Sequence, residues 1–134
     1  MTRDLTSVLV IDDEAPIRLL CRVNLEAEGM EVLEAGDGPS GLDIAQAEQP
    51  DVILLDVMMP RLDGWETAVQ LRRSPETAHI RVVLITARAQ EDDKNRGSRV
   101  GADAYLTKPF DPNEMIRVVR ELASGTPLAP PGSP

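Results

Sequence analysis

The sequence has little positive charge, one cysteine, one histidine and no long hydrophobic segment. Its formal net charge is −9, and phosphate backbones are bound by clustered Lys and Arg side chains, so direct nucleic-acid binding by this chain is not expected. Cys21 has no disulfide partner, and its place in a helical apolar pattern favours a small core residue over a nucleophile. His79 has no second His or Cys with which to build a zinc site, which favours a structural or solvent-facing role.

The longest apolar runs are far too short to cross a bilayer, so no membrane contact is expected. No signal-peptide pattern opens the chain, which makes a cytoplasmic protein the expectation. With 134 residues, 42% of them hydrophobic and 28% charged, the composition is that of a globular protein with one domain.

Four short apolar runs end in polar residues of different kinds. They are residues 8–11, which end at Asp12 and Asp13, residues 52–55, which end at Asp56, residues 82–85, which end at Thr86, and residues 104–106, which end at Thr107 and Lys108. If these runs are neighbouring parallel strands, their polar ends meet at one edge of the sheet. The result would be a cluster of carboxylates with one hydroxyl and one ammonium beside it.

Helical patterns alternate with these strands. Helices are predicted at residues 15–28, 40–49, 65–73 and 87–100 and after the acidic cap Asp111, a fifth strand at 30–35, and loops at 36–39 and 56–64. The segment 87–100 is nearly polar all round and should be the least stable helix. Five strands alternating with five helices predict an α/β fold with a doubly wound parallel sheet over residues 1–124. The Pro-rich residues 125–134 are expected to be a disordered tail or linker.

The polar strand ends suit phosphoryl chemistry. Asp12, Asp13 and Asp56 in one cleft would raise one another's pKa unless a cation intervened, and their oxygen ligands suit Mg²⁺. Lys108 would supply a positive charge, and Thr86 a hydroxyl donor, for phosphoryl oxygens. Asp56 follows the most continuous apolar strand and is the best candidate for forming an aspartyl phosphate. Each residue alone is better explained as a turn former, helix cap or solvated charge, but the four together reverse that preference.

Four motifs carry a family resemblance: LVIDDE at 9–14, DVMMPRLDG at 56–64, ITA at 85–87 and GADAYLTKPF at 101–110. Over about residues 5–123 the chain resembles the receiver domain of bacterial two-component response regulators. The resemblance implies a flavodoxin-like fold with strand order 2-1-3-4-5 and a phosphorylation-dependent signalling switch. Such a domain is a regulatory phosphoacceptor rather than an enzyme, although it assists its own phosphorylation and slow autodephosphorylation.

The resemblance also implies roles around the metal. Asp56 would accept a phosphoryl group from the phosphohistidine of a sensor histidine kinase or of a phosphotransfer protein. Asp13, Asp56 and the Met58 backbone carbonyl would bind Mg²⁺ directly, and Asp12 would act largely through water. Lys108 would pair with the phosphoryl group.

The implied switch begins at Thr86, which would move to bond the phosphoryl group while Tyr105 turns inward. This change would alter the face made by the helix at 87–100, the last strand and the last helix, and so control a downstream protein target. The peptide bond from Lys108 to Pro109 would be cis, and the small Ala87 would leave the phosphoryl pocket open. The alternative for Tyr105 is a half-buried strand aromatic with no switching role.

Two outputs stay open at this point. A stand-alone regulator that signals by protein binding is favoured, and the alternative is the receiver portion of a longer regulator with a DNA-binding or enzymatic effector after residue 134. A phosphorylation-dependent homodimer is compatible with either. However, Ala104 stands where receivers joined to winged-helix domains often carry an acidic residue used in dimer contacts.

Two rival readings of the motifs are less favoured. A haloacid dehalogenase-like phosphatase would carry a second Asp two residues after the nucleophile, where this chain has Met58. A receiver-like domain that does not bind phosphate is disfavoured because every required residue is present. Trp65 is expected in the core, and its alternative role is as an anchor for a partner.

Overall fold

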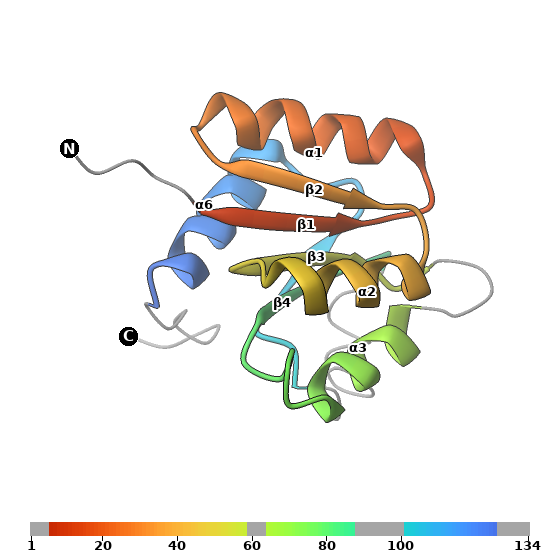
Figure 1. The fold of residues 1–134 in the computed structure, drawn as a ribbon. Helices are drawn as coiled ribbons and strands as arrows, with labels where there is room; N and C mark the ends of the chain where they lie inside the picture. Colours follow the sequence, from red (N-terminus) through yellow and green to blue (C-terminus); the bar gives the residue numbers. More distant parts are fainter. Residues whose placement is uncertain (1–5, 59–63, 88–100, 126–134) are drawn as a thin grey trace, which may run out of the picture.

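A computed structural model describes residues 6–58, 64–87 and 101–125, and shows a central parallel sheet between two layers of helices (Figure 1). The strands are β1 (Ser7–Ile11), β2 (Glu31–Ala35), β3 (Val52–Asp56), β4 (Arg81–Thr86) and β5 (Ala104–Thr107). They form one sheet in the order β2-β1-β3-β4-β5, and every neighbouring pair is parallel. The predicted fold class and strand order are therefore confirmed.

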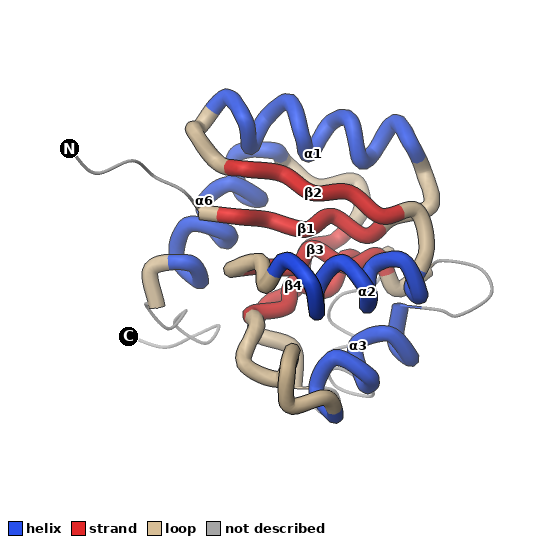
Figure 2. The backbone as a smooth tube through the Cα atoms, viewed as in Figure 1, coloured by secondary structure: helices blue, strands red, loops and turns tan. Residues whose placement is uncertain are grey.

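The described residues form four helices, two on each face of the sheet (Figures 1 and 2). Helices α1 (Ala15–Ala27) and α6 (Pro112–Ala123) pack on one face, and α2 (Gly38–Glu48) and α3 (Gly64–Arg73) on the other. The helix predicted at 87–100 falls from residue 88 onward outside the described residues, as do residues 126–134 of the predicted tail. None of the helices in the described ranges is long and apolar enough to span a membrane.

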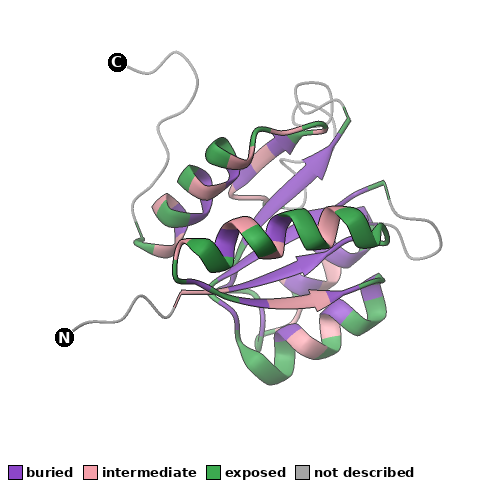
Figure 3. Cartoon of the chain, turned by 90° about the horizontal axis from the view of Figure 1, so that it is seen from above, coloured by how far each residue is buried: buried purple, intermediate pink, exposed green. Residues whose placement is uncertain are grey.

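The core lies on both faces of the sheet, because helices cover both faces. Strand β3 lies at the centre of the sheet. All five residues of β3 are buried, and Figure 3 shows strands of the sheet in the colour of buried residues beneath helices whose outer faces are exposed. Cys21 of α1 is fully buried, as predicted, and burial raises the pKa of its thiol to about 12. Trp65 of α3 is 6% exposed and packs in the core on the opposite face, which favours its predicted core role.

The boundaries of α2 differ from the prediction. The predicted end of the loop at 36–39 is wrong, because α2 already begins at Gly38, with Asp37 as its N-cap. The Asp37 Oδ1 accepts a hydrogen bond from the Ser40 amide at 2.8 Å, and the fixed φ of Pro39 suits a first helical turn. At the other end Gln49 adopts a φ of 51°, so the helix stops one residue before the predicted limit.

Candidate functional site

The predicted site residues lie where the strands end on one edge of the sheet. Asp56 and Thr86 are the last residues of β3 and β4, and Asp12 and Lys108 directly follow β1 and β5. Backbone hydrogen bonds fix the adjoining turns, because the Val57 amide donates to the Ile85 carbonyl at 3.0 Å and the Lys108 amide to the Thr86 carbonyl at 2.8 Å. The parallel register therefore brings residues from distant parts of the chain to one place.

Four acidic side chains gather at this edge. Asp12, Asp13, Glu14 and Asp56 each offer a carboxylate oxygen, and these oxygens lie within 4.8 Å of one another. Asp12 and Asp56 are 0% and 1% exposed, whereas Asp13 and Glu14 are exposed. Glu14 was not among the predicted site residues, and the one sequence signal for it was its place directly after two aspartates. A cluster of oxygen donors with both buried and open members fits a hard divalent cation such as Mg²⁺.

Short hydrogen bonds orient the two buried carboxylates. The Glu14 amide donates to Asp12 Oδ1 at 2.9 Å, and the Met58 amide donates to Asp56 Oδ1 at 2.8 Å. In both cases a carboxylate accepts from the amide two residues later, an arrangement that fixes the turn after the strand. Asp12 therefore acts as a turn former, but Glu14 rather than an aspartate occupies the N-cap position of α1.

Lys108 is the cation within this cluster. Its Nζ lies 3.1 Å from Asp56 Oδ2, 3.0 Å from Glu14 Oε2 and 3.2 Å from Asp12 Oδ2. Burial disfavours its ammonium form, but hydrogen bonds to Glu14 and Asp56 and the charge of Asp12 outweigh burial and raise the pKa of Lys108. Lys108 is therefore a permanent positive charge, and in the described part of the site it contacts three of the four carboxylates, those of Asp12, Glu14 and Asp56.

Asp12 carries the clearest sign of excess negative charge. Burial, helped by the charge of Asp56, raises the pKa of Asp12 to about 6, although hydrogen bonding from Glu14 and the charge of Lys108 act against the shift. Its Oδ2 is buried, and Lys108 Nζ lies 3.2 Å away in an ion pair that lowers the pKa but does not outweigh burial. A divalent cation beside this buried carboxylate would favour its ionised form further.

Gly64 lets α3 begin directly against the site. A Cβ atom at this position would collide with the backbone of Asp56 and Val57. No side-chain rotation can relieve a collision with backbone atoms, so the first residue of α3 must be glycine for the turn after β3 to keep its shape.

The predicted switch residues lie close to this edge of the sheet. Thr86 is fully buried at the end of β4, and its neighbour Ala87 is exposed. Tyr105 pairs with Leu84 across the β4–β5 ladder and is half-buried against the core on the α2 and α3 face. The peptide bond between Lys108 and Pro109 is cis, as the resemblance implied. The side chain of Met58 is 60% exposed.

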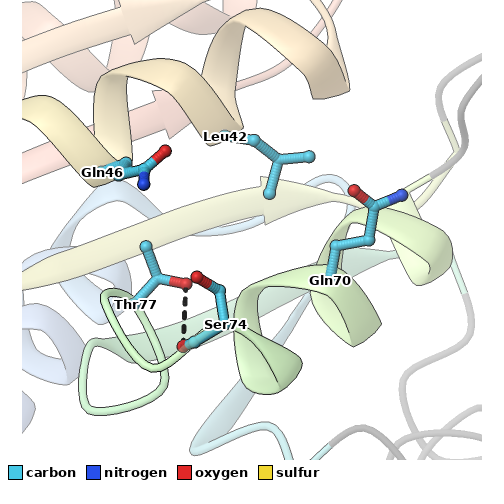
Figure 4. Close-up of a pocket in the computed structure, with 5 residues that line it drawn as sticks. All are labelled: Leu42, Gln46, Gln70, Ser74 and Thr77. Carbon is cyan, nitrogen blue, oxygen red and sulfur yellow. Dashed lines mark hydrogen bonds between the residues drawn. The ribbon is translucent and has the colours of Figure 1, made fainter.

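A separate groove lies between α2 and α3, away from the acidic cluster (Figure 4). Its volume is about 180 Å³, and it is lined by Leu42, Gln46, Gln70, Ser74 and Thr77. The Thr77 hydroxyl donates to the Leu71 carbonyl at 2.7 Å and so has its own partner. No charged side chain lines this groove, and it contributes nothing to the carboxylate site.

The chain is similar to known proteins in sequence and in fold. The chain matches the family model of the response regulator receiver domain over residues 8–120. It is 46% identical over 123 residues to the DNA-binding dual master transcriptional regulator RpaA of Synechocystis sp., covering 92% of this chain and 51% of RpaA. It is 37% identical over 118 residues to protein PilH of Pseudomonas aeruginosa, covering 88% of this chain and 98% of PilH.

Comparison of the fold with solved structures also finds response regulators. The chemotaxis response regulator CheY4 of Vibrio cholerae superposes with a TM-score of 0.82 at 31% identity, covering 88% of this chain and 98% of CheY4. The chain spans about half the length of RpaA and nearly the full length of PilH and CheY4.

Proposed function

Because this chain belongs to the response regulator receiver domain family, we propose that it is a phosphorylation-dependent switch of a two-component system. In this proposal Asp56 accepts a phosphoryl group from the phosphohistidine of a sensor histidine kinase or a phosphotransfer protein. The observation that carries the proposal is the contact of the Lys108 ammonium with Asp56, Glu14 and Asp12 at the carboxyl ends of the strands. In this proposal Lys108 would be the charge that binds the phosphoryl group, and the contact supports that role because the ammonium lies beside the candidate nucleophile.

The proposed step forms one bond and breaks another. A carboxylate oxygen of Asp56 bonds to phosphorus while the bond from phosphorus to the histidine nitrogen breaks, and the electron pair stays on the imidazole. Asp56 becomes an acyl phosphate. Lys108, already 3.1 Å from Asp56 Oδ2, would pair with one phosphoryl oxygen, and the Thr86 hydroxyl would donate to another.

Mg²⁺ is the proposed cofactor. Asp12, Asp13, Asp56 and the Met58 carbonyl would hold it, and when bound it would offset the charge on the transferring group. The gathering of four carboxylates and the raised pKa of Asp12, which reflects burial and the charge of Asp56, support this proposal. Glu14 is a further carboxylate within the same cluster, and its contact with Lys108 would position that ammonium.

The face of α1 beside the site is the proposed contact for the phosphoryl donor. Among the described residues, the large apolar side chains that are exposed are Leu19 at 59%, Leu20 at 37%, Val23 at 57% and Met58 at 60%. The first three belong to α1, which begins two residues after Asp13. An exposed apolar patch next to a charged site suits a protein partner.

We expect Val23→Glu to slow transfer from a kinase phosphohistidine and to leave phosphorylation by acetyl phosphate unchanged. Equal slowing of both reactions would refute this contact.

Phosphorylation would act on partners through Thr86 and Tyr105 and the face that includes β5 and α6. The favoured output is binding to a downstream protein, which the similarity to PilH and CheY4 supports. The second candidate is the receiver portion of a longer regulator, which the similarity to RpaA supports. A cytoplasmic site of action, a regulatory rather than enzymatic role and a phosphorylation-dependent homodimer are part of the same proposal.

The test is phosphorylation by a small donor. The protein and an Asp56→Asn variant are incubated with Mg²⁺ and acetyl phosphate, and their intact masses are recorded. We expect one phosphoryl adduct that requires the metal and is missing from the variant. If the folded wild-type protein gives no adduct and does not bind fluoroberyllate, the proposed switch chemistry is wrong.

A further inference from the structure

Arg72, near the end of α3, uses all five of its N–H donors. Its Nη1 donates to the carbonyls of Ala78 at 2.7 Å and Ile80 at 2.9 Å. Its Nε and Nη2 donate to the Gly101 carbonyl at 3.1 and 2.8 Å, and Nη2 also donates to Asp103 Oδ2 at 2.7 Å. A guanidinium has five donors in a fixed plane, so every one of them is satisfied. Arg72 thereby joins the segment that precedes β4 to the segment that precedes β5.

Asp103 continues this connection into the sheet. Its amide donates to the Val82 carbonyl at 2.9 Å, and its Oδ2 accepts from the Val82 amide at 2.8 Å. Residue 103 therefore pairs with Val82 through both backbone and side chain. The carboxylate that makes the second of these bonds is the one that Arg72 holds, so the starts of β4 and β5 are fixed in one register.

The register of β5 decides where Lys108 lies. β5 has four residues and, in the described sheet, pairs with β4 alone. Lys108 follows five residues after Asp103, a span of about 16 Å along an extended strand. A slip of two residues would preserve the alternation of side chains but would move Lys108 by about 7 Å, out of reach of Asp56.

We infer that Arg72 and Asp103 are positioning residues for Lys108, acting from the opposite edge of the sheet. This inference rests on the proposed function, in which Lys108 pairs with the phosphoryl group. Neither residue touches the acidic cluster. Their role is to hold β5 in register so that the ammonium of Lys108, which follows the strand, meets the phosphoryl oxygens.

Two ligands separate this role from a general contribution to folding. The metal-binding carboxylates come from the ends of β1 and β3, which do not depend on the β4–β5 register. Fluoroberyllate, a phosphoryl mimic, also needs Lys108. A variant that only loosens β5 should therefore weaken fluoroberyllate binding and spare Mg²⁺ binding, whereas a poorly folded variant should lose both.

The experiment compares Arg72→Met with Arg117→Met, which removes a 56%-exposed arginine on α6. We expect Arg72→Met to weaken fluoroberyllate binding and to slow acetyl phosphate phosphorylation by about tenfold, with the Mg²⁺ dissociation constant within twofold of wild type. Arg117→Met should match wild type in all three. Hydrogen exchange should also speed up at the Lys108 amide, which donates to Thr86, and not at amides of β1 or β3.

Asp103→Asn is the second variant if Arg72→Met folds poorly, because an amide oxygen can still accept from Val82 while its charge is gone. Equal loss of Mg²⁺ and fluoroberyllate binding, or no change in either, would overturn the inference. If wild-type protein fails to bind fluoroberyllate, the proposed function fails, and the exchange rate of the Lys108 amide still decides whether Arg72 positions that residue.

Discussion

The two ends of the strands differ in the balance of charge among the described residues. Carboxylates outnumber cations at the carboxyl ends, whereas arginines outnumber carboxylates near the amino ends of β4 and β5. At the carboxyl ends of the strands, four acidic side chains gather, and Lys108 contacts three of them, Asp12, Glu14 and Asp56. Near the amino ends of β4 and β5, two arginines surround Asp103, and backbone groups complete the network. The network around Asp103 holds the fold in place, whereas the acidic cluster has an excess of negative charge that a divalent cation would offset.

The largest effect should come from removing Lys108, which is the one cation of the acidic cluster among the residues that the structure describes. Lys108→Met should weaken fluoroberyllate binding by about 100-fold, because a charge-assisted hydrogen bond is lost. Mg²⁺ binding should tighten slightly, since a competing positive charge has gone. Titrations of each ligand would measure both constants. Weaker Mg²⁺ binding in a folded variant would show that Lys108 supports the metal instead of competing with it.

Adding a methyl group to a glycine tests how tightly the chain packs at each end of the strands. Gly64→Ala should lower the free energy of unfolding by about 2–3 kcal/mol, because its Cβ would meet the backbone of Asp56 and Val57. Gly101→Ala should cost only about 1 kcal/mol, which reflects its φ of +69° and a Cβ 3.6 Å from Arg72 Nε. Urea denaturation gives both values. Equal costs at the two positions would contradict the close approach of α3 to the site.

Neutralising one aspartate at each edge should have opposite effects on the free energy of unfolding. The pKa of Asp12 is about 6 in the folded protein against an ordinary 3.8, so the folded state binds this proton more tightly than the unfolded state does. Ionisation of Asp12 therefore costs stability, absent below about pH 4 and complete above about pH 6. Without metal, Asp12→Asn should stabilise the protein by about 1–3 kcal/mol at pH 7.5 and leave it unchanged at pH 4. Asp103→Asn should destabilise it by about 1 kcal/mol at pH 7.5.

Urea denaturation in EDTA at the two pH values would measure these changes, and added Mg²⁺ should stabilise wild type more than Asp12→Asn. A destabilised Asp12→Asn protein in EDTA would mean that the carboxylate cluster is already balanced by Lys108.

The sequence predicted the edge of the sheet that holds the site more fully than the opposite edge. Apolar runs that stop at Asp12, Asp56, Thr86 and Lys108 are visible in one dimension, and parallel strands bring their ends together. The contact between Glu14 and Lys108 joins residues 94 positions apart, and no local pattern encodes it. Helix α2 begins earlier than predicted, at Gly38. Asp37 and Pro39 are typical of loops, but they suit a helix start equally well.

The network at the opposite edge could not be predicted in the same way. Arg72, Arg81 and Asp103 are charged residues at the ends of elements, where solvated side chains are common. Their importance depends on how far Arg72 reaches between two segments, and that distance exists only after folding. Hydrogen bonds to backbone carbonyls leave no periodic signal in a sequence, unlike the alternation of apolar residues in strands and helices.

The buried thiol of Cys21 gives this protein its own reporter of unfolding. It is the one cysteine in the chain, it is fully buried, and its pKa of about 12 leaves almost no thiolate at neutral pH while the fold is intact. Alkylating reagents react with the thiolate, so labelling must wait until α1 separates from the sheet. The labelling rate would therefore count opening events, and would show whether magnesium or phosphorylation at one edge of the sheet slows the opening of the whole domain.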